Sequence, residues 1–453
     1  MNSERVSLHG QWSSRWAFIL ATTGAAVGLG NIWKFPYLAG ENGGGAFVLV
    51  YLLCVALLGI PMMMAEVLLG RRGRQTPMFT MRTVAEEANR TKHWQWLGLA
   101  GTVAGVLILS YYSVIGGWAL AYVFRAGNGD FLGGTAQTIS TLFDDFVGNP
   151  MALFGWHTAF MIMTMTVVAL GVQKGLERAT KYLMPALFLL LSVLVGYAAT
   201  TGYFMEGIAF LFKPDFSKLT GAGMLAAMGQ AFFSLSLGMG TIMIYGSYLP
   251  AGTSIARTSI IVALADTSIA IIAGLAIFPI VFANGLEPAA GPGLIFKTLP
   301  LAFAKMIGGT SMGVVFFVLL LVAAWTSSIS LIEPAITLLI EKFRMTRLRA
   351  SVWGGLATWV LGMGTVFSFN VWKDYRIFEK TFFDILDFLT SNIMLPLGGM
   401  FIAIFVGWTL AREVSQSELK MDGSPGFQLW YNLIRYVAPV AMLIVFGYAV
   451  GLL

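Results

Sequence analysis

The sequence predicts an all-α, polytopic membrane protein, and three observations lead to this prediction. Hydrophobic residues make up 57% of the 453 residues and charged residues only 11%, with a mean hydropathy of +0.77. Soluble domains carry about 25% charged residues, so this chain has too few charges to cover a globule in water. Its apolar residues form long segments near the about 20 residues that a helix needs to cross hydrocarbon. No alternating pattern of about ten residues recurs, which argues against a membrane β-barrel.

We expect about eleven membrane-spanning helices in a single transmembrane domain that covers 1–453. The charged residues gather in the short connections between the apolar segments, as in other membrane proteins. The expected spans are 14–38, 43–70, 95–125, 152–172, 179–203, 221–249, 256–284, 310–341, 348–370, 380–411 and 428–452.

The basic residues predict how the chain is oriented in the membrane. About 18 Lys and Arg lie on one side of the expected spans and about 9 on the other, and the more basic side faces the cytoplasm. The amino terminus is then cytoplasmic and, after an odd number of spans, the carboxyl terminus is external. The net charge of +6 therefore needs no nucleic-acid partner. The single cysteine, Cys54, excludes an intramolecular disulfide and a multi-cysteine metal site.

Two glycine-rich runs, 24–31 in span 1 and 234–241 in span 6, interrupt apolar segments. Glycine-rich sequence is poor helix, and unwound backbone inside a membrane survives only where it lines a cavity or binds something. The runs lie five spans apart, so the second copy has the opposite orientation. This pattern predicts an inverted 5+5 repeat, with unwound helices 1 and 6 meeting at a substrate site. Repeat one covers about 14–203, repeat two about 221–411, and an extra helix about 428–452.

The Gly24-x-x-x-Gly28 spacing is also a helix-packing motif, but two matched runs beside polar groups favour a binding site. Carbonyls freed by the breaks suit a hard cation or an ammonium group, and freed amides backed by a helix dipole suit a carboxylate. Asp266 has no lysine or arginine inside spans 6 to 8 to pair with, and such an acid indicates a cation site. The hydroxyls of 326–328 could serve the cation or bond back to their own helix. The candidates are the carbonyls of Gly24, Ala26, Val27, Phe233 and Ser234, the amides of Leu29 and Gly30, and the side chains of Asn31, Ser234, Asp266, Thr326, Ser327 and Ser328.

These residues carry a family resemblance that covers nearly the whole chain. The chain resembles the neurotransmitter:sodium symporter family, in particular its bacterial amino-acid transporters with the leucine-transporter fold. The matching motifs are Gly24-x-x-Val27-Gly28-Leu29-Gly30-Asn31-x-Trp33-Lys34-Phe35-Pro36-Tyr37, Glu41-Asn42-Gly43-Gly44-Gly45-Ala46-Phe47, Tyr111-Tyr112, Gln230-x-x-Phe233-Ser234-Leu235-Ser236 and Thr326-Ser327-Ser328.

The resemblance implies a sodium-coupled symporter of the bacterial inner membrane, which works by alternating access and is not an enzyme. It implies two transported sodium ions. The first would bind Ala26, Asn31, Ser234, Asp266 and the substrate carboxylate; the second would bind Gly24, Val27, Ala323, Thr326 and Ser327.

The resemblance also assigns the substrate contacts and the gates. The amides of Leu29 and Gly30 and the Tyr112 hydroxyl would hold the substrate carboxylate. Carbonyls near Ala26, Phe233, Ser234 and Ser236 would hold its ammonium. Tyr112 and Phe233 would form an external lid below a Lys34–Asp387 pair. At the cytoplasmic gate the position of the family's usual arginine is nearest His9, with Arg5 further off. The acid that it meets aligns with Glu341, in place of the usual aspartate.

Three features narrow the expected substrate to hydrophobic and aromatic L-amino acids. Gly28 stands where amine carriers of this family have an aspartate, so the substrate must bring its own carboxylate. The side-chain pocket has no charged group, and Met239 is flexible. We expect the pocket to comprise Ile108, Tyr112, Phe233, Ser236, Met239, Ser327 and Leu331.

Chloride independence is expected as well. Tyr51, Gln230 and Ser234 match three positions that surround chloride in relatives, but the fourth is Ala270. The fixed charge of Asp266 close by would repel a second anion.

Three alternatives are weaker. A proton-coupled carrier of the same fold would use Glu66 or Asp266. A channel would not need an occluding lid. A membrane-embedded enzyme would need a nucleophile beside a base or a histidine–carboxylate metal cluster, and neither is evident. The expected partners are an amino acid, Na⁺ and the lipid bilayer, and the sequence does not predict the oligomeric state.

Overall fold

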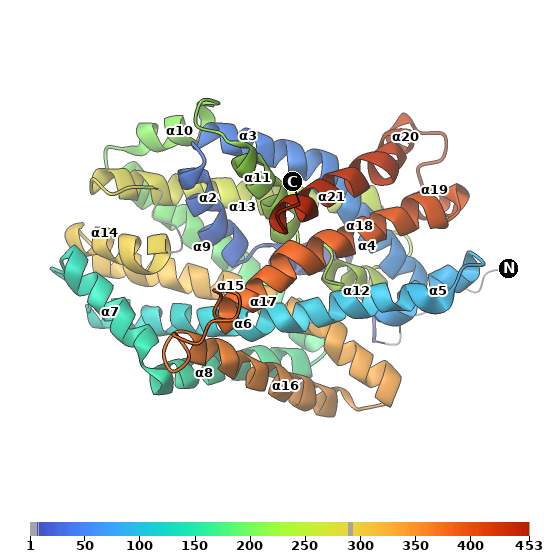
Figure 1. Cartoon of the computed structure of the whole chain (residues 1–453), viewed down its shortest axis with the longest axis horizontal. Helices are drawn as coiled ribbons and strands as arrows, with labels where there is room; N and C mark the ends of the chain where they lie inside the picture. Colours follow the sequence, from blue (N-terminus) through green and yellow to red (C-terminus); the bar gives the residue numbers. More distant parts are fainter. Residues whose placement is uncertain (1–6, 8, 289–292, 453) are drawn as a thin grey trace.

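A computed structural model describes residues 7, 9–288 and 293–452 of the chain. Within these ranges the chain is helical, without a strand beyond two isolated bridges. The long helices run mostly along one direction of the molecule (Figure 1). Nine helices are long and apolar enough to cross a membrane, or ten if the bent pair Arg15–Ala26 and Gly30–Glu41 counts as one span, all within the described residues.

Two long helices form the centre of the molecule. α6 (Gln95–Asn128) and α15 (Gly309–Phe343) pack along each other (Figure 1). α8 (Pro150–Ala169) and α16 (Arg347–Ser368) pack against α6 and against each other. The most apolar stretch of α15 is 78% buried, whereas that of Val172–Ala199 is 28% buried, so the lipid-facing surface belongs mainly to the outer helices.

The remaining elements connect or surround this centre, and several spans contain a π-helical turn (η). They are α1 (Arg15–Ala26), η1 (Gly30–Lys34), α2 (Phe35–Glu41), α3 (Gly45–Cys54), η2 (Val55–Gly59), α4 (Ile60–Gly73), α5 (Pro77–Glu87), the 3₁₀ turn η3 (Lys92–Trp94), α7 (Ala136–Gly148), η4 (Val172–Glu177), α9 (Arg178–Ala199), α10 (Phe204–Phe212), α11 (Gly221–Ser234), α12 (Thr241–Ser247), α13 (Ile255–Ala283), η5 (Leu294–Thr298), α14 (Leu299–Lys305), α17 (Phe382–Asp387), η6 (Phe388–Met394), α18 (Leu395–Ile404), η7 (Phe405–Thr409), α19 (Arg412–Leu419), α20 (Pro425–Asn432), η8 (Leu433–Val437) and α21 (Ala438–Ala449).

Capping residues explain where several helices begin. Asn149 caps α8 just before Pro150, and Thr220, Ser254 and Thr346 cap α11, α13 and α16 through side-chain oxygens. These oxygens accept hydrogen bonds from amides that have no partner inside the helix. The helix starts therefore follow directly from short polar residues that separate the apolar segments.

The count of eleven spans is not reproduced by continuous helices. The expected span 221–249 is divided into α11 and α12, and each part is too short to cross a membrane alone. Span 1 is divided as well, between α1 and η1, with a bend of 52°. The difference arises because the two glycine-rich runs leave helical geometry.

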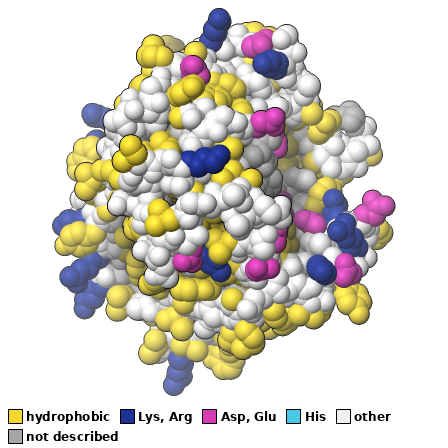
Figure 2. All heavy atoms as spheres, turned by 90° about the vertical axis from the view of Figure 1, so that its left-hand side faces the viewer, with side chains coloured by type: hydrophobic (Ala, Val, Ile, Leu, Met, Phe, Trp, Pro, Cys, Tyr) yellow, Lys and Arg dark blue, Asp and Glu magenta, His cyan; other side chains and the backbone are white. Residues whose placement is uncertain are grey.

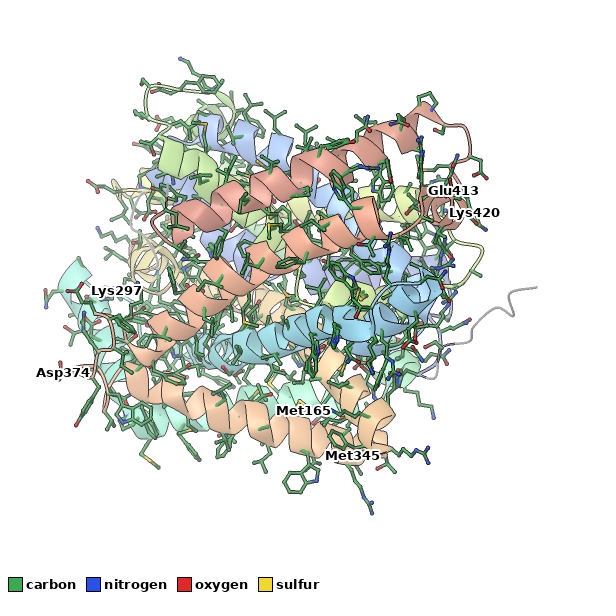
Figure 3. All side chains as sticks on the ribbon, turned by 45° about the vertical axis from the view of Figure 1, so that its right-hand side comes forward. Met165, Lys297, Met345, Asp374, Glu413 and Lys420 are labelled. Carbon is green, nitrogen blue, oxygen red and sulfur yellow. The ribbon has the colours of Figure 1, made fainter. Side chains whose placement is uncertain are left out.

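Charged side chains lie at both ends of the long axis. Lys297 and Asp374 are at one end, and Glu413 and Lys420 are at the opposite end (Figure 3). The first end also carries α7 and α14, and its surface shows acidic and basic side chains among apolar ones (Figure 2). Charged side chains at the ends of long apolar helices fit a protein that crosses a bilayer.

Candidate functional site

The first break separates α1 from η1. Val27 has an extended backbone (φ −70°, ψ 112°) that ends α1. The amide of Gly28 donates to Asn31 Oδ1 at 3.0 Å, so the carbonyl of Gly24 loses the bond that a continuous helix would give it. This carbonyl and that of Val27 instead accept bonds from the Ser327 hydroxyl, at 3.5 and 3.0 Å.

The second break, Leu235–Gly240, separates α11 from α12. Ser236, Gly238 and Gly240 have positive φ angles of 54°, 80° and 74°, a backbone region that favours glycine. Two hydrogen bonds to distant parts of the chain hold this segment. The Ser236 hydroxyl donates to the Ala25 carbonyl at 2.9 Å, and the Gly238 amide donates to Glu66 Oε1 at 2.7 Å. The Ser236 bond joins the two breaks directly.

A carboxylate cluster, made by the side chains of Asn31, Ser234 and Asp266, lies between the breaks. Asn31 Nδ2 donates to Asp266 Oδ1 at 2.7 Å and to Ser234 Oγ at 3.0 Å. Ser234 Oγ donates to Asp266 Oδ2 at 2.6 Å. All three side chains are buried. No lysine or arginine within the described ranges forms an ion pair with Asp266.

A second group of oxygens, the hydroxyl cluster, lies on the other side of the first break. It comprises the Thr326 and Ser327 hydroxyls with the carbonyls of Gly24, Val27 and Ala323. Ser327 reaches across to α1, but Thr326 donates within its own helix, to Val322 and Ala323 at 3.2 and 3.1 Å. The hydroxyl cluster offers only oxygen, the ligand that hard cations prefer. In the carboxylate cluster the oxygens of Asp266 and Ser234 face the Asn31 amide nitrogen, because Asn31 Oδ1 accepts a bond from the Gly28 amide. No group of three or more His, Cys, Asp or Glu side chains lies together in the described part of the chain.

A small cavity lies between the two breaks and α6. It has about 320 Å³ of free space between atoms, of which only about 20 Å³ has room for the centre of a water-sized sphere. Among the described residues, no charged side chain lines it. Its lining residues are Ala25, Ala26, Gly28, Gly30, Ile108, Tyr112, Phe233, Ser236, Met239, Ser327 and Leu331.

The structure thus brings every residue of the expected side-chain pocket to one cavity. Leu29 and Ser234 stand just outside it. The Leu29 amide donates to the Tyr112 hydroxyl at 3.0 Å, and Ser234 belongs to the carboxylate cluster. A Cβ at Gly28 would lie 2.5 Å from Ser327 Oγ and 2.6 Å from the Tyr112 hydroxyl, so any larger residue at position 28 would displace both.

The expected external gate is arranged differently from the sequence expectation. Lys34 and Asp387 do not form an ion pair within 4.0 Å. The Lys34 ammonium lies 4.6 Å from the centre of the Phe233 ring, and Asp387 Oδ1 accepts a bond from Ser391 at 2.9 Å. Cation–π attraction between Lys34 and the Phe233 ring therefore stands in place of the expected salt bridge in this structure.

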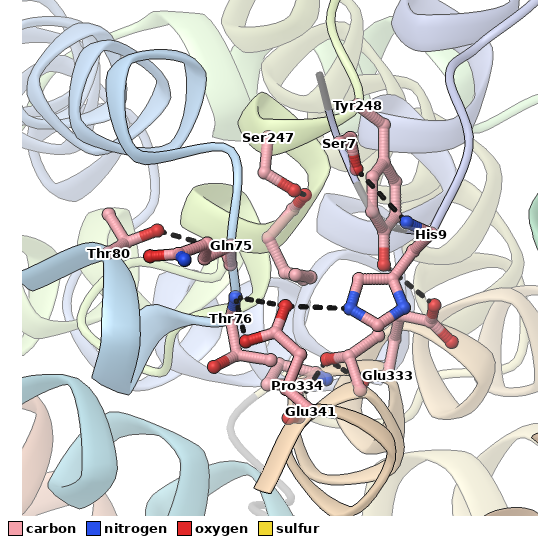
Figure 4. Close-up of polar contacts among 12 residues, drawn as sticks. Ser7, His9, Gln75, Thr76, Thr80, Ser247, Tyr248, Glu333, Pro334 and Glu341 are labelled. Atoms are coloured by element: carbon pink, nitrogen blue, oxygen red, sulfur yellow. Dashed lines mark hydrogen bonds and ion pairs between the residues drawn. The ribbon is translucent and has the colours of Figure 1, made fainter. Parts of the chain in front are cut away.

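The cytoplasmic-gate candidates His9 and Glu341 come together in one network of polar contacts (Figure 4). His9 Nε2 lies 2.7 Å from Glu341 Oε1, and the Thr76 amide donates to both oxygens of Glu341 at 3.1 and 3.2 Å. Trp12 Nε1 donates to the Tyr245 carbonyl at 3.1 Å. Arg5 lies outside the described residues. The contacts join the segment before α1 to α5, α12 and α15.

The positions that match a chloride site are buried. Gln230 Nε2 donates to the Gly30 carbonyl at 2.8 Å, and Tyr51 and Ala270 are 0% exposed. Sequence reasoning did not find the Gln230 bond or the role of Glu66 at the second break. Glu66 carried a signal, because it is an acid in the middle of an apolar span.

Comparisons with known proteins agree on one family. The model of the sodium:neurotransmitter symporter family matches residues 9–131 and 145–451. An uncharacterized sodium-dependent transporter of Bacillus subtilis, YhdH, is 39% identical over 446 residues, which are 98% of each chain. A sodium-dependent transporter of Haemophilus influenzae is 38% identical, over 96% of this chain and 97% of its own length. The crystal structure of MhsT in complex with L-phenylalanine superposes with a TM-score of 0.90 at 44% identity, over 97% of this chain and 99% of that chain.

Proposed function

The chain belongs to the sodium:neurotransmitter symporter family, and on this premise we propose that it imports hydrophobic and aromatic L-amino acids together with sodium. It is a sodium-dependent membrane transporter and not an enzyme. The observation that carries the proposed substrate class is the uncharged cavity between the two breaks. A charged substrate side chain would be buried there without a partner, at a cost of several kcal/mol.

The ends of the cavity suit an amino-acid backbone. The Tyr112 hydroxyl and the Gly30 amide would donate to a carboxylate, and the Leu29 amide would join them on leaving the Tyr112 hydroxyl, to which it is bonded here. Carbonyls near Ala26 and the second break are acceptors for an ammonium group. The solved relative MhsT binds L-phenylalanine, which supports the same class of substrate here.

The transported cations are proposed to be two sodium ions, one in each oxygen cluster. The carboxylate cluster, with the Ala26 carbonyl and the substrate carboxylate, would form the first shell. The hydroxyl cluster would form the second. Because the substrate completes the first shell, sodium and substrate raise each other's affinity by the same factor. Sodium that enters down its gradient then carries the amino acid with it.

Transport is proposed to be independent of chloride. Asp266 already supplies a fixed negative charge near Tyr51, Gln230 and Ser234, and Ala270 offers no hydroxyl to a second anion. Like charges in one buried site repel each other.

Alternating access requires the cavity to expand, because about 20 Å³ holds about one water molecule and no amino acid. We assign the external lid to Tyr112 and Phe233 with Lys34 above them, and the cytoplasmic gate to His9 and Glu341. The proposed orientation places the amino terminus in the cytoplasm and the carboxyl terminus outside the bacterial inner membrane. The two inverted repeats would move against each other within one domain.

Competition binding tests the proposed substrate class. Purified protein with labelled L-phenylalanine at saturating sodium should lose the label to leucine, isoleucine and tryptophan. Aspartate, glutamate, lysine and tryptamine should not compete, because they bring an unpaired charge or lack the carboxylate. Strong competition by tryptamine would contradict the proposal.

The variant Met239→Phe tests whether this pocket binds the side chain of the substrate. A larger, stiffer residue should penalise tryptophan more than leucine, by about 1–3 kcal/mol as in overpacked sites. The conservative variant Met239→Leu is the matched control and should keep the tryptophan-to-leucine ratio near that of the wild type. An unchanged ratio in Met239→Phe would place the side chain elsewhere.

Loosening of the cytoplasmic gate can be measured with a single cysteine. Ser247 is buried on α12 and directly precedes Tyr248, whose ring centre lies 6.4 Å from that of His9. Ser247→Cys in a Cys54→Ser background should therefore report access from the cytoplasmic side. His9→Ala should label several-fold faster, because a buried hydrogen bond to a charged group contributes about 1.5–3 kcal/mol. Equal labelling with and without His9 would show that this pair does not close the path.

A further inference from the structure

An apolar groove lies apart from the substrate cavity, between two helical segments that are long and apolar enough to cross a membrane. It lies between the start of α6 and the η6–α18 segment, with a volume of about 570 Å³. Trp94, Leu97 and Ala100 form one wall, and Ile393 and Phe401 belong to the other. This volume falls within the range of about 300–1,000 Å³ found for small-molecule sites. Since the groove is apolar and lies among membrane-spanning helices, its occupant must be apolar too.

The floor of the groove is the backbone of the second break. Gly101 and Gly398 both line the groove. A Cβ at Gly101 would lie 3.2 Å from the Gly238 carbonyl oxygen, and a Cβ at Gly398 would lie 3.0 Å from the same oxygen. The groove is therefore separated from the Gly238 carbonyl only by two glycines, which have no side chain. The amide of Gly238 donates to Glu66 inside the protein. The same peptide segment therefore contacts a buried carboxyl group on one side and the groove on the other.

The end of the groove that Thr91 and His93 line, here called its mouth, is flanked in the chain by basic residues. Thr91 and His93 line the groove next to the start of α6, and Arg90 and Lys92 are exposed beside them. Neither of these two basic residues forms an ion pair within the described part of the chain. From Trp94 to Gly101 the helix rises about 10 Å, about a third of the hydrocarbon thickness. The tryptophan at this level is typical of a membrane interface.

We propose that this groove binds an anionic phospholipid, with one acyl chain along the glycine floor and the phosphate at Arg90 and Lys92. The bound chain braces the backbone around Gly238 and so supports transport. The charge at the mouth selects an anionic headgroup over a zwitterionic one. The consequence for transport rests on the proposed function, whereas lipid binding itself does not.

Lipid retention tests the binding without any transport assay. The protein is purified from phosphatidylcholine vesicles that contain phosphatidylglycerol, and bound lipid is measured by mass spectrometry. Arg90→Gln with Lys92→Gln should weaken phosphatidylglycerol binding about 30-fold, from about 1 kcal/mol for each basic residue at an anionic surface. Lys174→Gln with Arg178→Gln removes the same charge from another basic loop and should bind like the wild type. Equal retention in both double variants would overturn the proposal.

A second pair of variants tests the groove itself. Ala100→Phe fills the groove, whereas Val103→Phe places the same phenyl side chain at an exposed position of α6 outside it. Ala100→Phe should lose the retained lipid and Val103→Phe should keep it. If both keep it, the lipid lies elsewhere. If Ala100→Phe instead dissociates a dimer, a second copy covers this face and the proposal is wrong.

The transport arm compares sodium-driven L-phenylalanine uptake in vesicles with and without phosphatidylglycerol. Wild type and the loop control should be stimulated several-fold by the anionic lipid, and the Arg90/Lys92 double variant should not be stimulated. Equal uptake in phosphatidylcholine alone would overturn the lipid effect. Absence of sodium-driven uptake in every vesicle would instead count against the proposed function, so the two failures are distinguishable.

Discussion

The two oxygen clusters flank the same break, yet they differ in charge and in how their ligands are held. In the carboxylate cluster, Asn31 and Ser234 both bond to Asp266, and the three side chains come from three different segments of the chain. The hydroxyl cluster is neutral, and only Ser327 reaches from α15 to the first break, while Thr326 bonds within its own helix. One cluster joins separate elements through a charge, and the other joins them through a single hydroxyl.

This difference predicts unequal sodium sites. A buried carboxylate without a basic partner is costly unless a cation lies beside it, so the carboxylate cluster should bind sodium tightly. A neutral set of oxygens has no such requirement. We therefore expect the hydroxyl cluster to hold sodium more weakly and to release it more readily when the gate before α1 opens.

The largest expected effect belongs to Asp266→Asn. Loss of the charge should weaken sodium binding by roughly 3 kcal/mol, about 100-fold, as when one partner of a buried ion pair is removed. Removing the fixed charge also removes the repulsion of chloride, so binding in the variant should respond to added chloride. Sodium titrations of L-phenylalanine binding in gluconate and in chloride measure both effects. Unaltered sodium affinity would contradict the assignment of the cluster.

Removal of both hydroxyls, Thr326→Ala with Ser327→Ala, should have an intermediate effect. Only carbonyl oxygens remain, and the loss of two neutral ligands should cost about 1–2 kcal/mol, about 10-fold in sodium affinity. Circular dichroism and thermal unfolding check that the variant folds. Ser328→Ala is a matched control, because its hydroxyl donates to Ala324 of its own helix at 2.8 Å; a loss as large in this control would remove the case for a site.

The smallest effect separates the two hydroxyls. Ser327→Ala should weaken sodium binding about fivefold, from about 1 kcal/mol for one hydrogen-bonding group, because this hydroxyl reaches Val27 at 3.0 Å. Thr326→Val should cost less, since its hydroxyl bonds within its own helix. Isothermal titration with sodium measures both values. If Thr326→Val loses more sodium affinity than Ser327→Ala, the two hydroxyls reorganise when the ion binds. The contrast drawn between the two clusters would then be wrong.

Much of the site could be predicted because it depends on the local amino-acid composition of short segments. The glycine-rich runs fall where the helices stop, and the residues of the expected pocket line one cavity. Contacts that depend on side-chain direction could not be predicted. The Lys34 ammonium lies over the Phe233 ring rather than beside Asp387. The sequence could not distinguish these two positions, because a flexible ammonium group suits both. Glu66 meets Gly238 across 172 residues, and no local pattern encodes that distance.

The number of spans shows the same limit. Hydropathy locates the segment 221–249 but does not tell whether it continues as one helix. The segment is divided where Ser236, Gly238 and Gly240 adopt positive φ angles. In the sequence, only the glycines indicate this break. The apolar groove behind Gly238 was equally hidden, because it depends on how α6 and α18 pack.

Uptake by reconstituted vesicles tests the central claim most directly. Labelled L-phenylalanine is offered outside vesicles in sodium gluconate or in potassium gluconate, with potassium gluconate inside. Coupling through the two oxygen clusters predicts accumulation above equilibrium only with an inward sodium gradient, without chloride, and its loss when the gradient is collapsed. Equal accumulation in potassium, or accumulation that requires chloride, would contradict the account.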